Sequence, residues 1–291
     1  MKGKICIVTG SSTGIGFETA LALANQGATV ITIARNKEKV EKTIEDLKSG
    51  SKNNQIDGFD IDLSSQKNIR TKALEIIKKY PRIDVLINNA GTWYSKLSYT
   101  DDNIEMQFAV NHLAYFLLTH ELLPGLIKSD DPRIINVASD SHFHGKMHFN
   151  DINLTRKYHG LRAYAQSKLA NILFTYEFER RKPIEKLSIN CLQPGLVKTN
   201  IGLKHTISFH GLAWKLRRLS GVSPAEGAET SIYLASSDEV KGISGKYWDK
   251  CKPKKSSKGS LIKEDAQRLW LLSERLCDID DYFDIISDDL E

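Results

Sequence analysis

The sequence contains no apolar run that approaches the roughly 20 residues needed to cross a bilayer, so no transmembrane helix is expected. A strand-like run begins within three residues of the start, and we therefore expect no signal peptide. Linkers, internal repeats and low-complexity blocks are also absent. We predict a single domain over residues 1–277, followed by an acidic tail at 278–291 that should be frayed.

Cysteine is scarce, with four residues in 291. Cys6, Cys191, Cys251 and Cys277 are far apart and match no zinc-binding spacing. The first two lie inside strand-like runs and are expected in the core. This usage predicts free thiols in a reducing compartment, and we expect a cytoplasmic protein.

Positive charge is not concentrated in one basic block either. The net charge of +5 is spread along the chain, so it does not predict a nucleic-acid partner. His142, His144 and His148 fall close together, but no carboxylates stand at ligand spacing beside them. We therefore expect these histidines near the mouth of a pocket and predict no metal site.

What the sequence does contain is a regular alternation of strand-like and helix-like segments. This order predicts an α/β fold, a Rossmann-like doubly wound parallel sheet between two layers of helices. The predicted strands are 4–9, 29–34, 56–61, 84–87, 133–138, 188–192 and 245–248, and the predicted helices are 17–26, 36–48, 65–79, 101–123, 161–181, 224–236 and 261–277.

The first strand runs into a glycine-rich turn and then a helix. Gly10, Gly14 and Gly16 have the spacing G-x-x-x-G-x-G. Glycines let the backbone approach a pyrophosphate, and the N-terminus of a helix favours an anion. The segment predicts a dinucleotide cradle, with a purely structural turn as the alternative.

The ends of the next strands carry further candidates. Arg35 stands where a site selective for NAD often has an acid, and its guanidinium would suit a 2′-phosphate. The alternative is a solvated arginine at a strand end. After the fourth strand, residues 88–91 (Asn-Asn-Ala-Gly) predict a tight turn with room for a flat ring.

Two helices carry polar residues inside apolar patterns. Tyr164 and Lys168 are four residues apart and share a helix face. A fixed positive charge would lower the pKa of the phenol and allow proton transfer near neutral pH. The alternative is an amphipathic tyrosine above a solvated lysine. Asn111 lies in the middle of the helix predicted at 101–123, where a hydrogen-bonded structural amide is the default.

The helix at 161–181 has a second apolar stripe, formed by Ala170, Phe174 and Phe178. It needs a cover, either a neighbouring helix or another subunit, and we expect a two-fold contact in a homo-oligomer. Residues 203–220 mix aromatic and basic side chains. A lid over an apolar substrate, a basic amphipathic helix on a membrane surface and a plain surface helix are all compatible with this composition.

Taken in order, these motifs resemble the short-chain dehydrogenases/reductases over about residues 3–250. Within that family the chain is most similar to the retinol dehydrogenase-like branch, because of the runs at 111–120 and 167–174 and the long insert between Ser139 and Tyr164. The motifs that carry the resemblance are Thr9-Gly10-Ser11-Ser12-Thr13-Gly14-Ile15-Gly16, Asn88-Asn89-Ala90-Gly91, Asn111, Ser139, Tyr164-x-x-x-Lys168 and Pro194-Gly195.

The resemblance implies specific roles. Tyr164 would be the general acid or base, Lys168 would lower its pKa and bind the nicotinamide ribose, Ser139 would polarise the carbonyl, and Asn111 would support a water that relays the proton. The implied cofactor-binding set is Gly10, Ser12, Gly14, Ile15, Gly16, Arg35, Asp62, Leu63, Asn89, Ala90, Gly91, Tyr164, Lys168, Pro194, Gly195 and Thr199.

We therefore predict an oxidoreductase that interconverts an apolar alcohol and an aldehyde or ketone. NADP(H) is the expected cofactor and NAD(H) the alternative. Many NADP-preferring members carry a basic residue in the glycine-rich turn, where this chain has Thr13, so the prediction of NADP(H) rests mainly on Arg35. The rival function is a catalytically idle dinucleotide-binding module that senses redox state or binds a partner.

Overall fold

The computed structural model describes residues 1–197 and 221–289. In these ranges eight strands form one sheet in the order β3-β2-β1-β4-β5-β6-β7-β8, in which all neighbours are parallel except β7 and β8. The strands are β1 (Ile5–Thr9), β2 (Thr29–Ala34), β3 (Ile56–Asp60), β4 (Val85–Asn88), β5 (Arg133–Val137), β6 (Ser188–Gln193), β7 (Tyr247–Asp249) and β8 (Lys252–Pro253).

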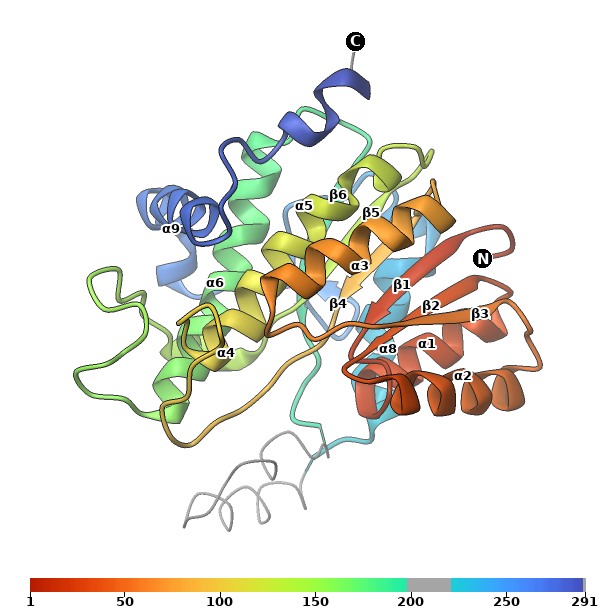
Figure 1. Cartoon of the computed structure of the whole chain (residues 1–291), viewed down its shortest axis with the longest axis horizontal. Coiled ribbons are helices and arrows are strands. Elements are labelled where there is room, and N and C mark those ends of the chain that lie inside the picture. Colours follow the sequence, from red (N-terminus) through yellow and green to blue (C-terminus); the bar gives the residue numbers. More distant parts are fainter. Residues whose placement is uncertain (198–220, 290–291) are drawn as a thin grey trace.

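Helices cover both faces of this sheet (Figure 1). One layer contains α1 (Gly14–Asn25), α2 (Lys37–Ser51) and α8 (Pro224–Ser236). The other contains α3 (Gln66–Lys79), α5 (Ala114–Leu126) and α6 (Gly160–Arg181), with α9 (Lys263–Leu276) packed against α6. The predicted three-layer, Rossmann-like parallel architecture is confirmed.

The central strands β1, β2, β4, β5 and β6 are buried on both faces because their residues alternate between two cores. In β1, Ile7 joins the core beneath α3, α5 and α6, whereas Cys6 and Val8 join the core beneath α1 and α8. A strand buried on both sides needs apolar residues at successive positions, which is why these strands are short continuous apolar runs in the sequence.

The helix predicted at 101–123 begins only at Met106 and contains a π-helical segment. Glu105 caps the short helix α4 (Met106–Phe108), because its carboxylate accepts hydrogen bonds from the amides of Gln107 and Phe108. A π-helical segment at Ala109–Leu113 then leads into α5. The sequence therefore predicted the apolar character of this region correctly but placed the start of the helix too early.

The second apolar stripe of α6 is covered by the same chain. Phe174 and Phe178 are almost fully buried, and their ring centroids lie 6.1 and 6.3 Å from that of Trp270 in α9. Tyr282 packs on the same cluster, 6.0 Å from Phe178. The expectation that this stripe meets another subunit is wrong, because its cover is intramolecular.

The acidic tail is not frayed over its described length. Tyr282 and Ile286 are fully buried, and the Tyr282 hydroxyl donates to the carbonyl oxygen of Phe116 in α5 at 2.7 Å. A short 3₁₀ helix, Asp284–Asp289, ends the described part of the chain. The apolar residues between the acidic ones supply the burial that holds this segment on the fold.

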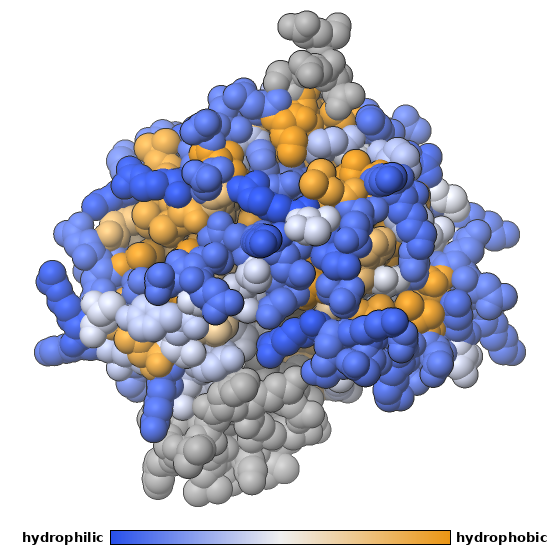
Figure 2. Space-filling view, viewed as in Figure 1, coloured by the Kyte–Doolittle hydropathy of each residue, from blue (hydrophilic) through white to orange (hydrophobic). Residues whose placement is uncertain are grey.

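The surface is mainly hydrophilic on the face that Figure 2 shows, with apolar residues in separate patches. Exposed large apolar side chains among the described residues include Leu74 of α3 and Leu271 of α9. None of the described helices is long and apolar enough to span a bilayer. All four cysteines are free thiols, and the cytoplasmic location inferred from them stays a prediction.

Candidate active site

The predicted site residues converge at the carboxyl edge of the sheet. In a parallel sheet every strand ends at the same edge, so the loops that follow the strands lie side by side. Gly10, Asn89 and Pro194 directly follow β1, β4 and β6, respectively. Ser139 lies two residues after the end of β5. The strand order reverses between β1 and β4, and ligands of doubly wound sheets bind at such a reversal.

The glycine-rich turn packs closely on the loop after β4. A Cβ on Gly10 would lie 2.8 Å from the Cα of Ala90, and one on Gly16 would lie 2.4 Å from the Nδ2 of Asn89. Gly10 and Gly14 both have a positive φ, which side chains disfavour. These positions therefore need glycine for local geometry as well as for the approach of a ligand.

Thr9 joins the two loops through hydrogen bonds. Its hydroxyl accepts from the backbone amides of Asn89 and Ala90, each at 2.9 Å. The Asn89 side chain donates back to the carbonyl oxygen of Thr9 at 2.8 Å. The Tyr115 hydroxyl donates to the Ala90 carbonyl oxygen at 2.7 Å. These hydrogen bonds hold the loop after β4 in place beside the glycine-rich turn.

The glycine-rich turn fits the phosphates of a dinucleotide. The N-cap residue of α1, Thr13, makes no side-chain cap, which leaves the helix N-terminus open to an anion. The fully buried Ser11 hydroxyl has no hydrogen-bond partner in the described structure. A buried hydroxyl is costly to leave unpaired, so both features favour a ligand here. The residues placed at this end are Gly10, Ser12, Gly14, Ile15 and Gly16.

The remaining cofactor candidates lie around the same edge. Arg35 is exposed directly after β2. Asp62 accepts hydrogen bonds from the amide and hydroxyl of Ser64, and the half-buried Leu63 packs against the core. Gly195 has a φ of 80° and donates its amide to the Gln193 side chain. Gly91 and Pro194 complete the turns after β4 and β6, whereas Thr199 and the segment 203–220 lie outside the described residues.

Tyr164 and Ser139 meet between α6 and the loop after β5. Burial raises the pKa of the Tyr164 phenol, and a hydrogen bond between the Tyr164 and Ser139 side chains acts in the opposite direction. Ser139 also accepts from the backbone amide of Ser141 at 3.1 Å, which orients its side chain. The Trp93 ring forms an edge contact with Tyr164 at a centroid distance of 5.8 Å and provides an aromatic wall.

Burial outweighs the charge effect expected between Lys168 and Tyr164. Burial raises the pKa of the Tyr164 phenol to about 12, although Ser139 partly offsets this. Burial also lowers the pKa of the Lys168 ammonium to about 7. The Lys168 Nζ donates to the carbonyl oxygen of Val137 at 2.8 Å and lies 5.7 Å from the centroid of the Tyr164 ring. The predicted lowering of the tyrosine pKa is therefore not found, because both charged forms lose hydration.

Asn111 is buried in the π-helical segment, and protein groups satisfy its amide. Its Oδ1 accepts from the backbone amide of Thr92 at 2.7 Å, and its Nδ2 donates to the Thr92 carbonyl oxygen and to the Ser167 hydroxyl. Ser167 donates in turn to the carbonyl oxygen of Tyr164. Asn111 thus ties the loop after β4 to the tyrosine helix, and its water-relay role stays a prediction.

His142 is a residue whose role the sequence reasoning missed. Instead of lying at a pocket mouth, it is fully buried, with Nδ1 2.7 Å from the Ser139 carbonyl oxygen. Its Nε2 accepts from the backbone amide of Ser257 at 3.0 Å. Nδ1 therefore carries the proton, and burial lowers the pKa of the imidazole. The histidine joins the Ser139 loop to a C-terminal segment that no local pattern connects to it.

Comparison with known proteins identifies the family. The sequence profile of the short chain dehydrogenase family matches residues 4–206. The chain belongs to this family. Human retinol dehydrogenase 13 is 42% identical over 281 residues, which cover 94% of this chain and 84% of that protein. Retinol dehydrogenase 14 of Mus musculus is 38% identical over 291 residues, covering 94% and 86% respectively.

Solved structures agree with this assignment. An uncharacterised protein from Mycobacterium paratuberculosis superposes with a TM-score of 0.75 at 30% identity, covering 96% of this chain and 94% of its own. A protein described as a short chain dehydrogenase from Escherichia coli, complexed with NADPH, gives 0.70 at 26% identity and covers 87% and 98%. This short-chain dehydrogenase is thus an oxidoreductase acting on CH–OH groups, in the retinol dehydrogenase-like branch.

Proposed function

We propose that this short-chain dehydrogenase uses NADP(H) to interconvert an apolar alcohol with its aldehyde or ketone. The observation that carries the proposal is the placement of the Ser139 and Tyr164 hydroxyls together, beside the buried Lys168, at the sheet edge that holds the glycine-rich turn. Two hydroxyls at one point can bind one carbonyl oxygen, which is what acid-assisted hydride transfer requires.

The protein side chains supply the proton and orient the substrate oxygen. When bound, the reduced cofactor supplies the hydride. In carbonyl reduction, Ser139 donates a hydrogen bond to the substrate oxygen, and Tyr164 donates its proton to the same oxygen. A pKa of about 12 keeps the Tyr164 phenol protonated at neutral pH, as a general acid must be. Lys168, when protonated, stabilises the phenolate that Tyr164 leaves behind. In alcohol oxidation, the phenolate of Tyr164 accepts the proton.

The preference for NADP(H) is supported by charge at the end of β2. Arg35 is exposed there, with Lys37 two residues later, and β2 ends in Ala34 instead of an acid. A guanidinium can form charge-assisted hydrogen bonds with a 2′-phosphate. Similar solved structures from Shigella flexneri and Escherichia coli are complexes with NADP and NADPH.

An apolar substrate is supported by the aromatic wall beside the tyrosine. Trp93 is buried and forms an edge contact with the Tyr164 ring. The named relatives are retinol dehydrogenases. We therefore place the substrate among apolar carbonyl compounds, a class that includes retinoids, steroids, lipid aldehydes and xenobiotics.

A substrate panel tests this function directly. The protein is incubated with NADPH and with each aldehyde or ketone of a series of increasing apolar size, and the loss of NADPH absorbance is followed. The expected result is faster turnover of apolar members than of short, hydrated ones, and faster turnover with NADPH than with NADH. If no member of the series consumes either reduced cofactor above the rate without protein, the proposed function is wrong.

A further inference from the structure

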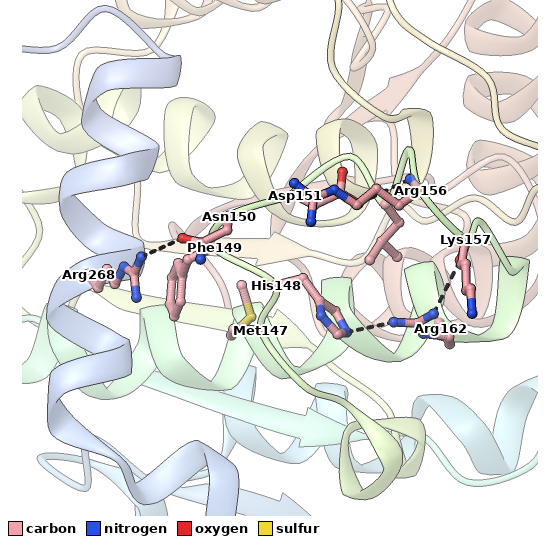
Figure 3. Close-up of a pocket in the computed structure, with 10 residues that line it drawn as sticks. Met147, His148, Phe149, Asn150, Asp151, Arg156, Lys157, Arg162 and Arg268 are labelled. Atoms are coloured by element: carbon pink, nitrogen blue, oxygen red, sulfur yellow. Dashed lines mark hydrogen bonds between the residues drawn. The ribbon is translucent and has the colours of Figure 1, made fainter.

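A cavity lies outside the residues of the candidate active site (Figure 3). Its volume is about 510 Å³, which falls within the roughly 300–1,000 Å³ of typical small-molecule sites. Met147, Phe149 and Leu154, from the long loop before α6, supply its apolar lining. Met147 and Leu154 are buried, so this apolar surface is part of the folded structure.

Four cationic side chains line the same cavity. Arg156 and Lys157 come from the loop, Arg162 from the first turn of α6 and Arg268 from α9. In Figure 3 the loop cations and Arg162 lie toward one end, whereas Arg268 and Phe149 lie together at the other. Two segments separated by more than 100 residues thus bring positive charge to the same cavity.

The cavity is on the opposite side of α6 from the catalytic residues. An α-helix turns 100° per residue, so Arg162 and Gln166 share one side, and Tyr164 and Lys168 share a side about 200° away. Gln166 confirms this arrangement, because its amide accepts from the backbone of His148 at 2.9 Å. A ligand in the cavity would therefore not occupy the substrate site.

The positive charge in the cavity has little internal compensation. Within the described residues, no carboxylate forms an ion pair with Arg156, Lys157, Arg162 or Arg268. The one lining carboxylate, Asp151, accepts hydrogen bonds from the loop itself, through the Thr155 amide and hydroxyl and the Arg156 amide. Four cations thus line a cavity whose one carboxylate already accepts hydrogen bonds from the loop.

Two of the guanidinium groups are held in place. Arg162 donates to His148 Nε2 at 3.1 Å and to the Lys157 carbonyl oxygen at 3.2 Å. Because His148 accepts this bond, its ring is neutral and adds no charge. Arg268 lies over the Phe149 ring, 4.4 Å from its centroid, and donates to Asn150 Oδ1 at 3.2 Å. Held guanidinium groups lose less entropy when they bind an anion.

We propose that this cavity binds a small amphiphilic anion, with a phosphate or carboxylate group joined to an apolar chain. The cations would hold the charged group through charge-assisted hydrogen bonds, and Met147, Phe149 and Leu154 would contact the chain. Concave, positively lined surfaces concentrate anions, and the apolar lining distinguishes this site from one for a free inorganic ion. This ligand is separate from the substrate and from the cofactor.

Calorimetric titration with hexyl phosphate tests the site. The protein is first saturated with NADP⁺, so that the phosphate-binding turn before α1 is not available to the probe. One hexyl phosphate should bind per chain, at least tenfold more tightly than inorganic phosphate, and hexanol should show no measurable binding. Equal affinity for hexyl and inorganic phosphate would contradict the apolar half of the proposal.

The double variant Arg156→Gln, Lys157→Gln removes two exposed cations whose side chains form no hydrogen bond or ion pair with the other described residues. It should weaken hexyl phosphate binding by at least about tenfold per cation, the usual scale for a charge-assisted contact. Arg275→Gln is the matched control, because Arg275 is an exposed cation of α9 outside the cavity. The affinity of this variant for hexyl phosphate should match that of the unmodified protein within about twofold, a difference too small to reflect a lost ionic contact.

Two further results would overturn the proposal. Hexyl phosphate binding that survives unchanged in Arg156→Gln, Lys157→Gln would place the probe elsewhere on the protein. Binding only to vesicles containing an anionic phospholipid, with no binding of soluble hexyl phosphate, would show a membrane surface instead of a small-molecule site. Retained NADP⁺ affinity in the double variant shows that the protein is folded, so either result is decisive.

Discussion

The ammonium nitrogen of Lys168 donates to the carbonyl oxygen of Val137 at 2.8 Å, and it lies 5.7 Å from the centroid of the Tyr164 ring. The lysine thus joins the tyrosine helix to the last residue of β5, close to the loop that carries Ser139. This hydrogen bond fixes α6 against the end of β5, and so fixes Tyr164 relative to the loop that carries Ser139.

Replacing Tyr164 with Phe removes the hydroxyl and keeps the ring against Trp93. If Tyr164 transfers the proton, turnover should fall by about 10²–10⁴-fold, the usual scale for a positioned acid or base. Affinity for NADPH should change little. Lys168→Ala should reduce both turnover and cofactor affinity, because Lys168 is expected to bind the ribose and also supports the Tyr164 phenolate.

The matched control for this test is Tyr99→Phe, which removes an exposed hydroxyl away from the site. Steady-state rates with an accepted substrate, and fluorescence transfer from Trp to bound NADPH, are measured for all three variants. Near-normal NADPH oxidation by Tyr164→Phe would refute the assigned role of the phenol. Normal energy transfer in the same variant shows that it is folded and loaded.

Arg35→Ala should weaken NADPH binding and leave NADH binding unchanged. The loss of one charge-assisted contact to the 2′-phosphate is expected to cost about 1.5–3 kcal/mol of binding free energy. Calorimetric titration of both reduced cofactors measures this, with Lys78→Ala, which removes an exposed cation of α3, as the control. Tighter binding of NADH than NADPH by the unmodified protein would reverse the predicted preference.

His112 should make the protein sensitive to acid. This imidazole is fully buried against Ser273 Oγ, at 3.0 Å from Nε2, and burial lowers its pKa from 6.5 to about 3. Between these two values the unfolded chain binds the proton and the folded chain does not. The free energy of unfolding should therefore fall as the pH drops below about 6.5, by up to about 1.4 kcal/mol per pH unit from this group.

Urea unfolding at a series of pH values measures this dependence. His112→Gln should show a shallower loss of stability between pH 6.5 and pH 4, over and above any constant loss of packing. His144→Gln, which removes an exposed histidine, should keep the slope of the unmodified protein. An unchanged slope in His112→Gln would show that another group controls the acid sensitivity.

Tyr282→Ala should destabilise the fold although Tyr282 lies in the C-terminal tail. Its ring centroid is 4.5 Å from that of Phe116 and 4.7 Å from that of Trp270. Removing a buried aromatic ring typically costs about 3–5 kcal/mol, whereas Tyr282→Phe loses only the hydrogen bond to Phe116, about 1 kcal/mol. Urea unfolding gives both values. Equal midpoints for Tyr282→Ala and the unmodified protein would mean that the tail does not cover the core in solution.

The intramolecular cover of α6 predicts that Phe174→Glu disrupts the fold instead of only separating subunits. Because Phe174 is buried among rings of α9 and the tail, an acid there would lack a partner and should unfold the chain. Circular dichroism measures whether the variant is folded, and light scattering measures whether its mass differs from that of the unmodified protein. If the variant is folded and its mass is smaller than that of the unmodified protein, the stripe contacts another subunit after all.

The sequence by itself determined the alternation of strands and helices, the glycines of the first turn and the spacing of Tyr164 and Lys168. Each of these depends on neighbours a few residues away, or on the rule that parallel strands end at one edge. The fold and the convergence of the candidate site could therefore be predicted without coordinates. The predicted start of the helix at 101–123 was wrong because Glu105 caps a later start.

Only the tertiary structure decided what lies against these elements. An apolar stripe shows that α6 needs a cover but not that α9 and Tyr282 of the same chain provide it. His142 meets Ser257 across 115 residues. The pKa values of Tyr164 and Lys168 shift with burial by groups distant in sequence, so the sign of the effect follows from packing and not from spacing.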